Sequence, residues 1–151
     1  MRVLRWRLTI ASTPERVWAK LTDFATMHRW FLGVRRVTLH ALAPHAGAER
    51  TLSLLGGISH LERLGRWDPA ARSFSIEVLE PPAIARDWVG SIAVGGTDGA
   101  AELSWELRYR PRFGLPGRVL DALIVAPVLN LAFTLSLRRF ADQIQRARPA
   151  A

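Results

Sequence analysis

The chain has 151 residues, a formal net charge of +8 at pH 7 and no cysteine. This length fits one domain, residues 1–151, with one sizeable core, and the absence of thiols excludes disulfides, thiolate metal sites and cysteine nucleophiles. The positive charge favours a phosphate-rich or anionic partner, or else reflects a compositional bias, since Lys20 is the only lysine among 21 basic residues. The basic residues are scattered and no DNA- or RNA-binding signature occurs, so no specific nucleic-acid binding is expected.

Residues 2–10 predict the first strand, because apolar and polar side chains alternate there with the period of a half-buried sheet. The apolar face carries Leu4, Trp6, Leu8 and Ile10. Charged residues are interleaved throughout this segment, unlike the continuous apolar run of a signal peptide, so a cytoplasmic location is expected.

The stretch STPERVWAKLTDF predicts a short helix over residues 14–24. Ser12 or Thr13 provides the N-cap, Pro14 takes the first helical position, and apolar residues follow at helical spacing. A second short helix or turn contains MHRWF, and Gly33 ends it.

Period-two alternation then continues through most of the chain and predicts six more strands. The expected strands are residues 34–42, 49–55, 58–67, 72–80, 84–94 and 101–110. Short turn sequences separate them, which indicates an antiparallel meander, and GGTDG at 95–99 is interpreted as a hairpin turn rather than a phosphate cradle. In the last strand, Leu103, Trp105, Leu107 and Tyr109 share one face.

Residues 118–147 lack this alternation and predict a long helix that is apolar nearly all round between Val119 and Leu137. A transmembrane span has a similar composition. Pro127 should kink such a helix and Asp121 would be costly in hydrocarbon, so a helix laid across the sheet is the favoured interpretation.

This order of elements resembles the START-like or Bet v 1-like (SRPBCC) superfamily, in particular its bacterial polyketide cyclase/dehydrase and lipid-transport group. The resemblance depends on TPERVWAKLTDFATMHRWFLGVRRVTL, HLERLGRWDPAARSFSIEVLEPP, DWVGSIAV, AELSWELRYRP and the terminal helix. It implies an α+β helix-grip fold: a curved seven-stranded antiparallel sheet wrapped around the long C-terminal helix. Two short helices after the first strand would close one end of an internal cavity and point Trp30 and Phe31 toward its mouth.

Catalytic signatures are few in this sequence. No Gly-x-Ser-x-Gly elbow occurs and the four histidines lack metal-ligand spacing, so neither a metal nor another cofactor is expected. His60 and Glu62 share one face of a strand, either as a pocket acid/base pair or on a solvated outer face. The resemblance favours a cavity-facing Glu62, which would need Arg50 or Arg86 as a partner.

The expected pocket is aromatic and apolar, with few polar groups. The predicted ligand contacts are Trp30, Arg50, Glu62, Trp88, Trp105, Tyr109, Leu120, Ile124 and Val128. Residues 120–128 are expected to form a movable lid whose outer face can rest on a membrane, with Arg112 and Arg118 nearby.

Three functions are compatible with this pattern. The leading hypothesis is a carrier or sensor of a hydrophobic molecule such as a lipid, quinone or polyketide. The second is a cyclase or dehydratase that uses Glu62 and His60 to move protons. The third is an interaction module whose basic surface contacts a membrane, a ribosome or an acidic partner. The sequence names neither the ligand nor the oligomeric state.

Overall fold

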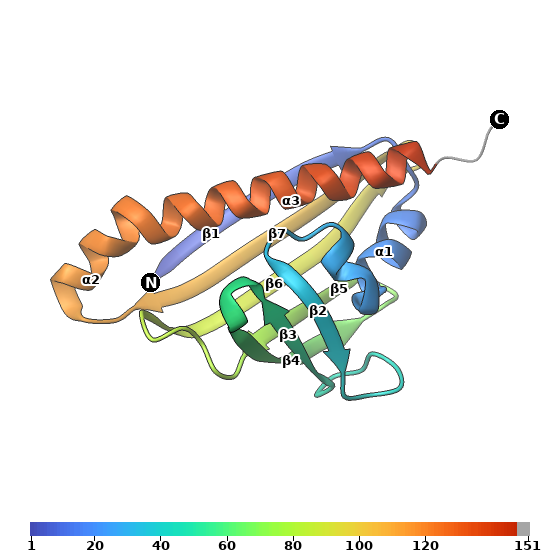
Figure 1. Cartoon of the computed structure of the whole chain (residues 1–151). Helices are drawn as coiled ribbons and strands as arrows, with labels where there is room; N and C mark the ends of the chain where they lie inside the picture. The colour runs from blue at the N-terminus through green and yellow to red at the C-terminus, as the bar shows by residue number, and fades with distance from the viewer. Residues whose placement is uncertain (148–151) are drawn as a thin grey trace.

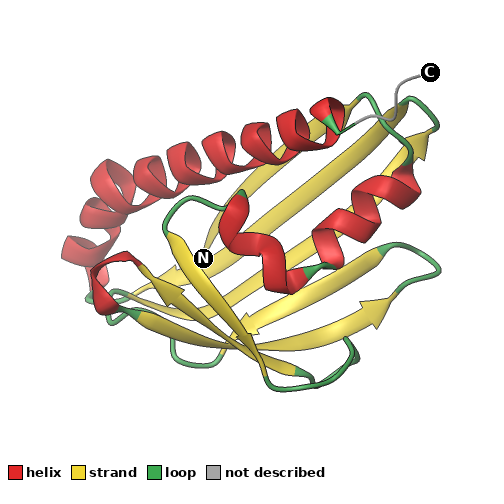
Figure 2. Ribbon diagram, turned by 45° about the vertical axis from the view of Figure 1, so that its right-hand side comes forward, coloured by secondary structure: helices red, strands yellow, loops and turns green. Residues whose placement is uncertain are grey.

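The computed structural model describes residues 1–147, in which one antiparallel sheet carries helices on its concave side (Figures 1 and 2). The chain begins with β1 (Arg2–Ile10), α1 (Pro14–Thr22) and the 3-10 helix η1 (Phe24–Arg29). The later strands are β2 (Val34–Leu39), β3 (Glu49–Leu54), β4 (Ser59–Asp68), β5 (Ser73–Val78), β6 (Ala85–Thr97) and β7 (Ala100–Pro111). A short 3-10 turn, η2 (Leu55–Gly57), joins β3 to β4, and a helical segment follows β7: α2 (Gly114–Leu120), η3 (Asp121–Val125) and α3 (Ala126–Arg146).

The seven strands have the order β1-β7-β6-β5-β4-β3-β2, and all neighbours are antiparallel. Strands β2 to β7 form the meander expected from the short turns, and β1 pairs with the free edge of β7. Figure 2 shows the sheet curving around the space that α3 covers, with α1 and η1 at one end. This is the expected helix-grip arrangement.

The turn between β6 and β7 confirms the hairpin interpretation of GGTDG. Thr97 pairs with Ala100, so Asp98 and Gly99 form the turn. Gly96 has a φ of +85°, and a Cβ there would lie 2.3 Å from the carbonyl oxygen of Ala100. Only glycine avoids this contact, because it has no Cβ.

The first helix forms as its capping residues predict. The Oγ1 of Thr13 accepts a 3.2 Å hydrogen bond from the backbone N–H of Arg16, and Pro14 occupies the first turn. Helix α1 ends at Thr22, two residues before the expected end, and η1 begins at Phe24, earlier than the expected MHRWF. The tighter 3-10 turns of η1 redirect the chain immediately, which places Phe24 and Met27 in the core.

The inner face of the sheet supplies most of the core. The four apolar residues of β7 predicted to share a face, from Leu103 to Tyr109, are each no more than 6% exposed. Phe133, Leu137 and Phe140 of α3 pack against this face as part of the same cluster. Alternation therefore assigned the dry face of the sheet correctly.

The C-terminal helical segment is longer than expected and changes its geometry along its length. It begins at Gly114 instead of residue 118, and a π-helical turn, η3, directly precedes Pro127. Such a turn accommodates an irregular hydrogen-bond ladder, which Pro127 imposes because it has no N–H to donate. The second half of α3 is anchored: the Nζ of Lys20 donates to Gln143 at 2.9 Å, and the backbone N–H of Ala11 donates to Gln145 at 3.1 Å.

Candidate functional site

A cavity of about 230 Å³ lies between the concave face of the sheet, η1 and α3. Its wall is mainly apolar and aromatic. The lining residues are Met27, Phe31, Val34, Arg50, Leu52, Leu54, His60, Glu62, Ile76, Val78, Pro82, Trp88, Gly90, Trp105, Leu107, Leu129 and Phe133. A site of this kind excludes water and selects apolar molecules by shape.

Arg50 and Glu62 form a buried ion pair in the cavity wall. They face each other across β3 and β4, and their side chains are only 5% and 11% exposed. The Nε and one Nη of Arg50 each lie 2.9 Å from the same oxygen of Glu62. The guanidinium also covers the ring of Phe24, with its central carbon 4.4 Å from the ring centroid. The structure therefore selects Arg50, and not Arg86, as the partner of Glu62.

Two polar atoms at this end of the cavity lack hydrogen-bond partners among the described residues. They are Nη1 of Arg50 and Nδ1 of His60, and both are buried. Nη1 of Arg50 is a donor, and a buried donor without a partner costs about 1–3 kcal/mol, so a ligand or water that accepts a hydrogen bond from it would be stabilised. The apolar cavity thus has one polar end.

A second polar cluster anchors the helical segment beside the cavity. Asp121, at the start of η3, is 3% exposed and accepts hydrogen bonds from Tyr109 and from the Nε of Arg2, the latter at 2.6 Å. Tyr109 stacks on the cavity residue Trp88, with ring centroids 4.8 Å apart. These contacts connect the junction of α2 and η3 to β1 and β7.

We expect Tyr109 to resist ionisation while the protein is folded. Burial, followed by the hydrogen bond to Asp121, raises the pKa of Tyr109 above its ordinary value of about 10. A raised pKa in the folded state stabilises the fold below about pH 10, and this contribution is lost as the pH rises through the folded-state pKa.

The measurement is an ultraviolet titration followed in parallel by circular dichroism. Tyr109 is the only tyrosine in the sequence, so phenolate absorbance reports this residue alone. The phenolate is expected to appear well above pH 10 and together with unfolding, and Tyr109→Phe should remove the absorbance change. A phenolate that forms near pH 10 in an intact fold would contradict the buried position of the hydroxyl.

The structure brings five of the predicted site residues together in the cavity wall. They are Arg50, His60, Glu62, Trp88 and Trp105. Glu62 therefore faces the cavity, and the solvated-face alternative is wrong for it.

The other five predicted contacts lie outside this wall. Trp30 is 1% exposed but packs in the core, 4.8 Å from Phe140 between ring centroids, while its neighbour Phe31 lines the cavity. Tyr109 lies behind Trp88. Leu120, Ile124 and Val128 face solvent, at 40, 54 and 59% exposure. These five residues therefore do not line the cavity, because helical rotation turns the three helical residues outward and packing places Trp30 in the core. Their contact with a ligand stays a prediction.

Sequence reasoning missed the residues by which α3 and β6 complete the cavity. Leu129 and Phe133 are the contacts from α3, spaced four apart as residues on one helical face must be. Gly90 leaves space in the wall, since a Cβ there would meet the Nε1 of Trp105 at an ordinary 3.5 Å. The spacing of four residues between Leu129 and Phe133 could be seen in the sequence. It did not identify the cavity face, because the other faces of this helix carry apolar residues at the same spacing.

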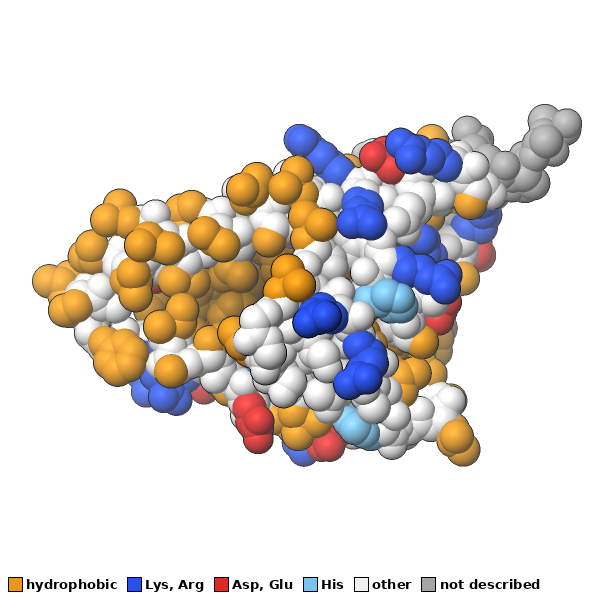
Figure 3. All heavy atoms as spheres, in the orientation of Figure 1, with side chains coloured by type: hydrophobic (Ala, Val, Ile, Leu, Met, Phe, Trp, Pro, Cys, Tyr) orange, Lys and Arg blue, Asp and Glu red, His pale blue; other side chains and the backbone are white. Residues whose placement is uncertain are grey.

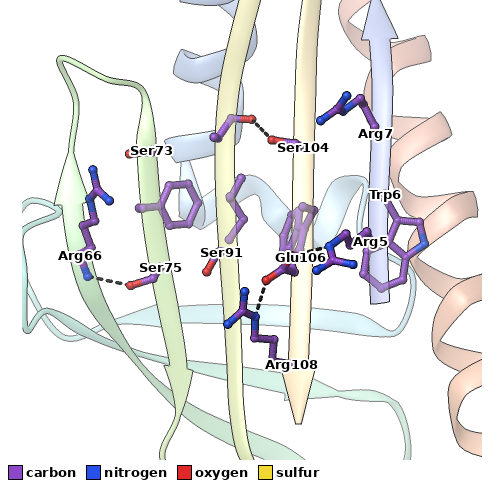
Figure 4. A pocket seen from close by; sticks show the side chains of 14 residues that line it. Arg5, Trp6, Arg7, Arg66, Ser73, Ser75, Ser91, Ser104, Glu106 and Arg108 are labelled. Atoms are coloured by element: carbon purple, nitrogen blue, oxygen red, sulfur yellow. Dashed lines mark hydrogen bonds and ion pairs between the residues drawn. The ribbon is translucent and has the colours of Figure 1, made fainter. Parts of the chain in front are cut away.

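A larger hollow, of about 780 Å³, lies on the opposite, outer face of the sheet (Figure 4). Charged side chains stand around it: Arg5, Arg7, Arg66 and Arg108, with four serines among the other lining residues. Glu106 is bound there by Arg5 at 2.6 Å and by Arg108, and these hydrogen bonds lower the pKa of the Glu106 carboxyl. Its charge and its openness to water make this hollow unsuitable for a hydrophobic ligand, despite its size.

The described residues offer no metal centre. Within residues 1–147, no group of three or more histidine, aspartate or glutamate side chains is placed to hold an ion.

The curved sheet, the helix that it grips and the apolar cavity between them define a helix-grip protein with a fold that binds hydrophobic ligands. A family model described as "Polyketide cyclase / dehydrase and lipid transport" matches residues 2–145, and the chain belongs to this family. The match confirms the resemblance seen in the sequence.

Relatives and solved structures agree with this assignment. "Uncharacterized protein Rv2574" of Mycobacterium tuberculosis is 30% identical over 146 residues, covering 93% of this chain and 84% of the relative. A solution NMR structure from Thermobifida fusca has a TM-score of 0.78 at 24% identity and covers 100% of this chain and 98% of its own. Norcoclaurine synthase from Thalictrum flavum, solved with dopamine and hydroxybenzaldehyde, has a TM-score of 0.71 at 12% identity, covering 99% and 89%. At these identities the two structures show the shared fold alone.

Proposed function

We propose that the protein is a carrier or sensor that binds a hydrophobic small molecule with a hydrogen-bond acceptor at one end. The observation that carries this proposal is the apolar cavity whose only buried ion pair among the described residues, Arg50–Glu62, lies beside the unpartnered nitrogens of Arg50 and His60. A carbonyl or carboxylate oxygen would accept the missing hydrogen bond of Arg50, and also one from His60 in the tautomer that carries its proton on Nδ1, and the aromatic wall would cover the apolar remainder of the ligand.

The size of the cavity limits the ligand. Its 230 Å³ lies below the roughly 300–1,000 Å³ of sites for drug-sized molecules. A small aromatic or short-chain molecule therefore fits the cavity as it stands, whereas a long acyl chain must extend through the mouth.

The test replaces a glycine of the cavity wall with a larger residue, so that its side chain occupies the cavity. Gly90→Leu places a side chain into the site, and Gly95→Leu is its matched control, because Gly95 lies on the same strand and a Cβ there meets no atom within 4 Å. We expect the Gly90 variant to reduce the affinity for a hydrophobic dye, followed by tryptophan emission, at least about tenfold, since burying one leucine-sized group is worth about 1.5–3 kcal/mol. The control should bind like the wild type.

Two outcomes would contradict this proposal. The first is equal affinity in the two leucine variants, and the second is a wild-type protein that shows no saturable binding. If Gly90→Leu does not fold, Gly90→Ala replaces it, because its Cβ makes only ordinary contacts. Native mass spectrometry of the purified protein would then identify any molecule that it carries.

The second candidate function is a cyclase or dehydratase. It is favoured by one observation, namely that His60 and Glu62 both line the cavity from β4. An imidazole and a carboxylate so placed can transfer a proton to and from a bound chain. Glu62→Gln, which keeps the shape of the side chain, should then abolish turnover of a polyketide-type substrate while leaving its binding intact. Unchanged turnover would reject this function.

A further inference from the structure

Most of the large apolar side chains that are exposed among the described residues lie on the helical segment and at η2, beside the cavity. We call them the apolar rim: Phe113, Leu115, Val119, Leu120, Leu123, Ile124, Val128 and Leu131 on the helical segment, with Leu55 and Ile58 at η2. Figure 3 shows hydrophobic side chains covering α2 and the first half of α3 and surrounding a hollow. Leu115 and Leu123 are 73 and 72% exposed. A contiguous apolar face of this kind is unusual for a protein that meets only water.

Most of the residues in the most apolar part of the helical segment are not buried. Residues Gly114–Arg146 are long and apolar enough to cross a membrane, yet only 22% of the most apolar 18-residue window is buried. The second half of α3 uses its apolar side chains against the sheet, as Phe140 and Ile144 show with 0 and 4% exposure. In the first half, Leu129 and Phe133 face the cavity, but the opposite side has no such cover among the described residues, as Val128 and Leu131 show with 59 and 61% exposure. Its outer face therefore needs a different apolar environment.

The apolar rim is continuous with the cavity wall. Leu54 and Leu129 line the cavity. Their neighbours in the chain, Leu55 and Val128, are exposed residues of the rim. A hydrophobic molecule that leaves the cavity between η2 and α3 thus meets apolar side chains first. Contact with a bilayer at this rim would let the molecule pass between protein and lipid without crossing water.

Positive charge borders the rim. Arg86, Arg112 and Arg118 gather at the start of α2, beside Phe113. Asp121 is the only carboxylate between residues 112 and 137, and it is buried against Arg2 and Tyr109. Asp87, one residue from Arg86 in the chain, pairs with Arg110 at 3.4 Å. Apolar residues flanked by arginines are the composition of a helix that lies on an anionic bilayer.

We propose that the apolar rim docks on an anionic bilayer with the cavity mouth facing the lipid. The inference rests on the proposed function, because it names the surface through which the hydrophobic ligand is exchanged. The segment lies on the bilayer and does not span it, since Asp121 ties the end of α2 to β1 and β7 and the second half of α3 packs on the sheet. A second copy is the less suitable occupant, because it would cover the mouth and bring together two chains of net charge +8.

The test is co-sedimentation with vesicles of phosphatidylcholine alone and of phosphatidylcholine mixed equally with phosphatidylglycerol. Wild-type protein should bind the mixed vesicles more tightly. Leu115→Ser/Leu123→Ser should weaken that binding by on the order of tenfold or more, because two inserted leucines are lost. Leu42→Ser is the control, since Leu42 is fully exposed outside the rim. It should bind like the wild type.

The contribution of positive charge to vesicle binding is tested with two double variants. One removes two arginines beside the rim, and the other removes two arginines at the outer hollow. Arg112→Ser/Arg118→Ser should weaken binding to the mixed vesicles by about thirtyfold, at about 1 kcal/mol for each arginine near the surface. Arg7→Ser/Arg66→Ser changes the net charge equally but lies at the outer hollow (Figure 4), and it should have little effect. Equal weakening by both pairs would overturn the docking surface, as would a wild-type protein that binds neither vesicle.

Two further measurements separate this proposal from its alternatives. A dimer in light scattering that Leu115→Ser/Leu123→Ser dissociates would overturn it in favour of a second copy on the rim. Saturable dye binding in solution should survive in that variant, because neither leucine lines the cavity. Loss of dye binding by Gly90→Leu with vesicle binding retained supports both proposals. Vesicle binding by a wild-type protein that binds no dye would reject the ligand-binding function and leave the docking surface standing.

Discussion

Replacing Arg50 with methionine is expected to lower the free energy of unfolding by about 3–5 kcal/mol. The change leaves the carboxylate of Glu62 in an apolar wall without its cationic partner, and Glu62 is only 9% exposed. A buried charge that loses its counter-ion costs more than the pair itself contributes, because the desolvation penalty is no longer offset. Urea unfolding followed by tryptophan emission measures the loss.

The double variant Arg50→Met/Glu62→Met is the control for this prediction. Removing both charges together should recover most of the stability, since well-packed apolar residues replace a buried ion pair at little cost. The same variant should bind a neutral alcohol probe but lose its preference for the carboxylate of equal chain length. A loss below about 1 kcal/mol in the single variant would show that water reaches Glu62 and that the wall is not dry there.

Trp30→Ala is expected to cost a similar 3–5 kcal/mol, for a different reason. Trp30 is 1% exposed, and its ring contacts Phe31, Trp105 and Phe140 at centroid distances of 4.8–6.5 Å. Its removal leaves a cavity in the core that the surrounding aromatic side chains cannot fill.

Trp88→Ala provides the contrast. Trp88 lines the ligand cavity and stacks on Tyr109, so its truncation should lower stability less and dye affinity more than Trp30→Ala does. Thermal unfolding and dye titration of both variants test this division of roles. A Trp30 variant of normal stability but impaired dye binding would restore the original assignment of Trp30 to the ligand.

Local sequence features were enough to predict the elements. Alternation over residues 2–10 gave β1 with its observed bounds, and Thr13 with Pro14 gave the start of α1. These signals are local because a strand repeats every two residues and a helix start depends on a few adjacent side chains. The end of α1 was predicted two residues too late, since the change from α1 to η1 depends on what Phe24 packs against.

The candidate site could be predicted only in part. Glu62 was recognised as needing an arginine, but Arg50 and Arg86 were equal candidates until the register of β3 and β4 placed Arg50 opposite. Register follows from which strands are neighbours and how their turns are built, and the sequence pattern gives the face of a residue but not its partner.

By itself, the sequence determined the number and order of the strands, their dry faces, the helix-grip fold and the charge of the surface. The tertiary structure alone decided which aromatic residues face the cavity and which side of the last helix is covered. The physical reason is that this helix is apolar nearly all round, so its periodicity marks no inner face. Only packing against the sheet turned Leu129 and Phe133 inward and left Leu123 in contact with solvent.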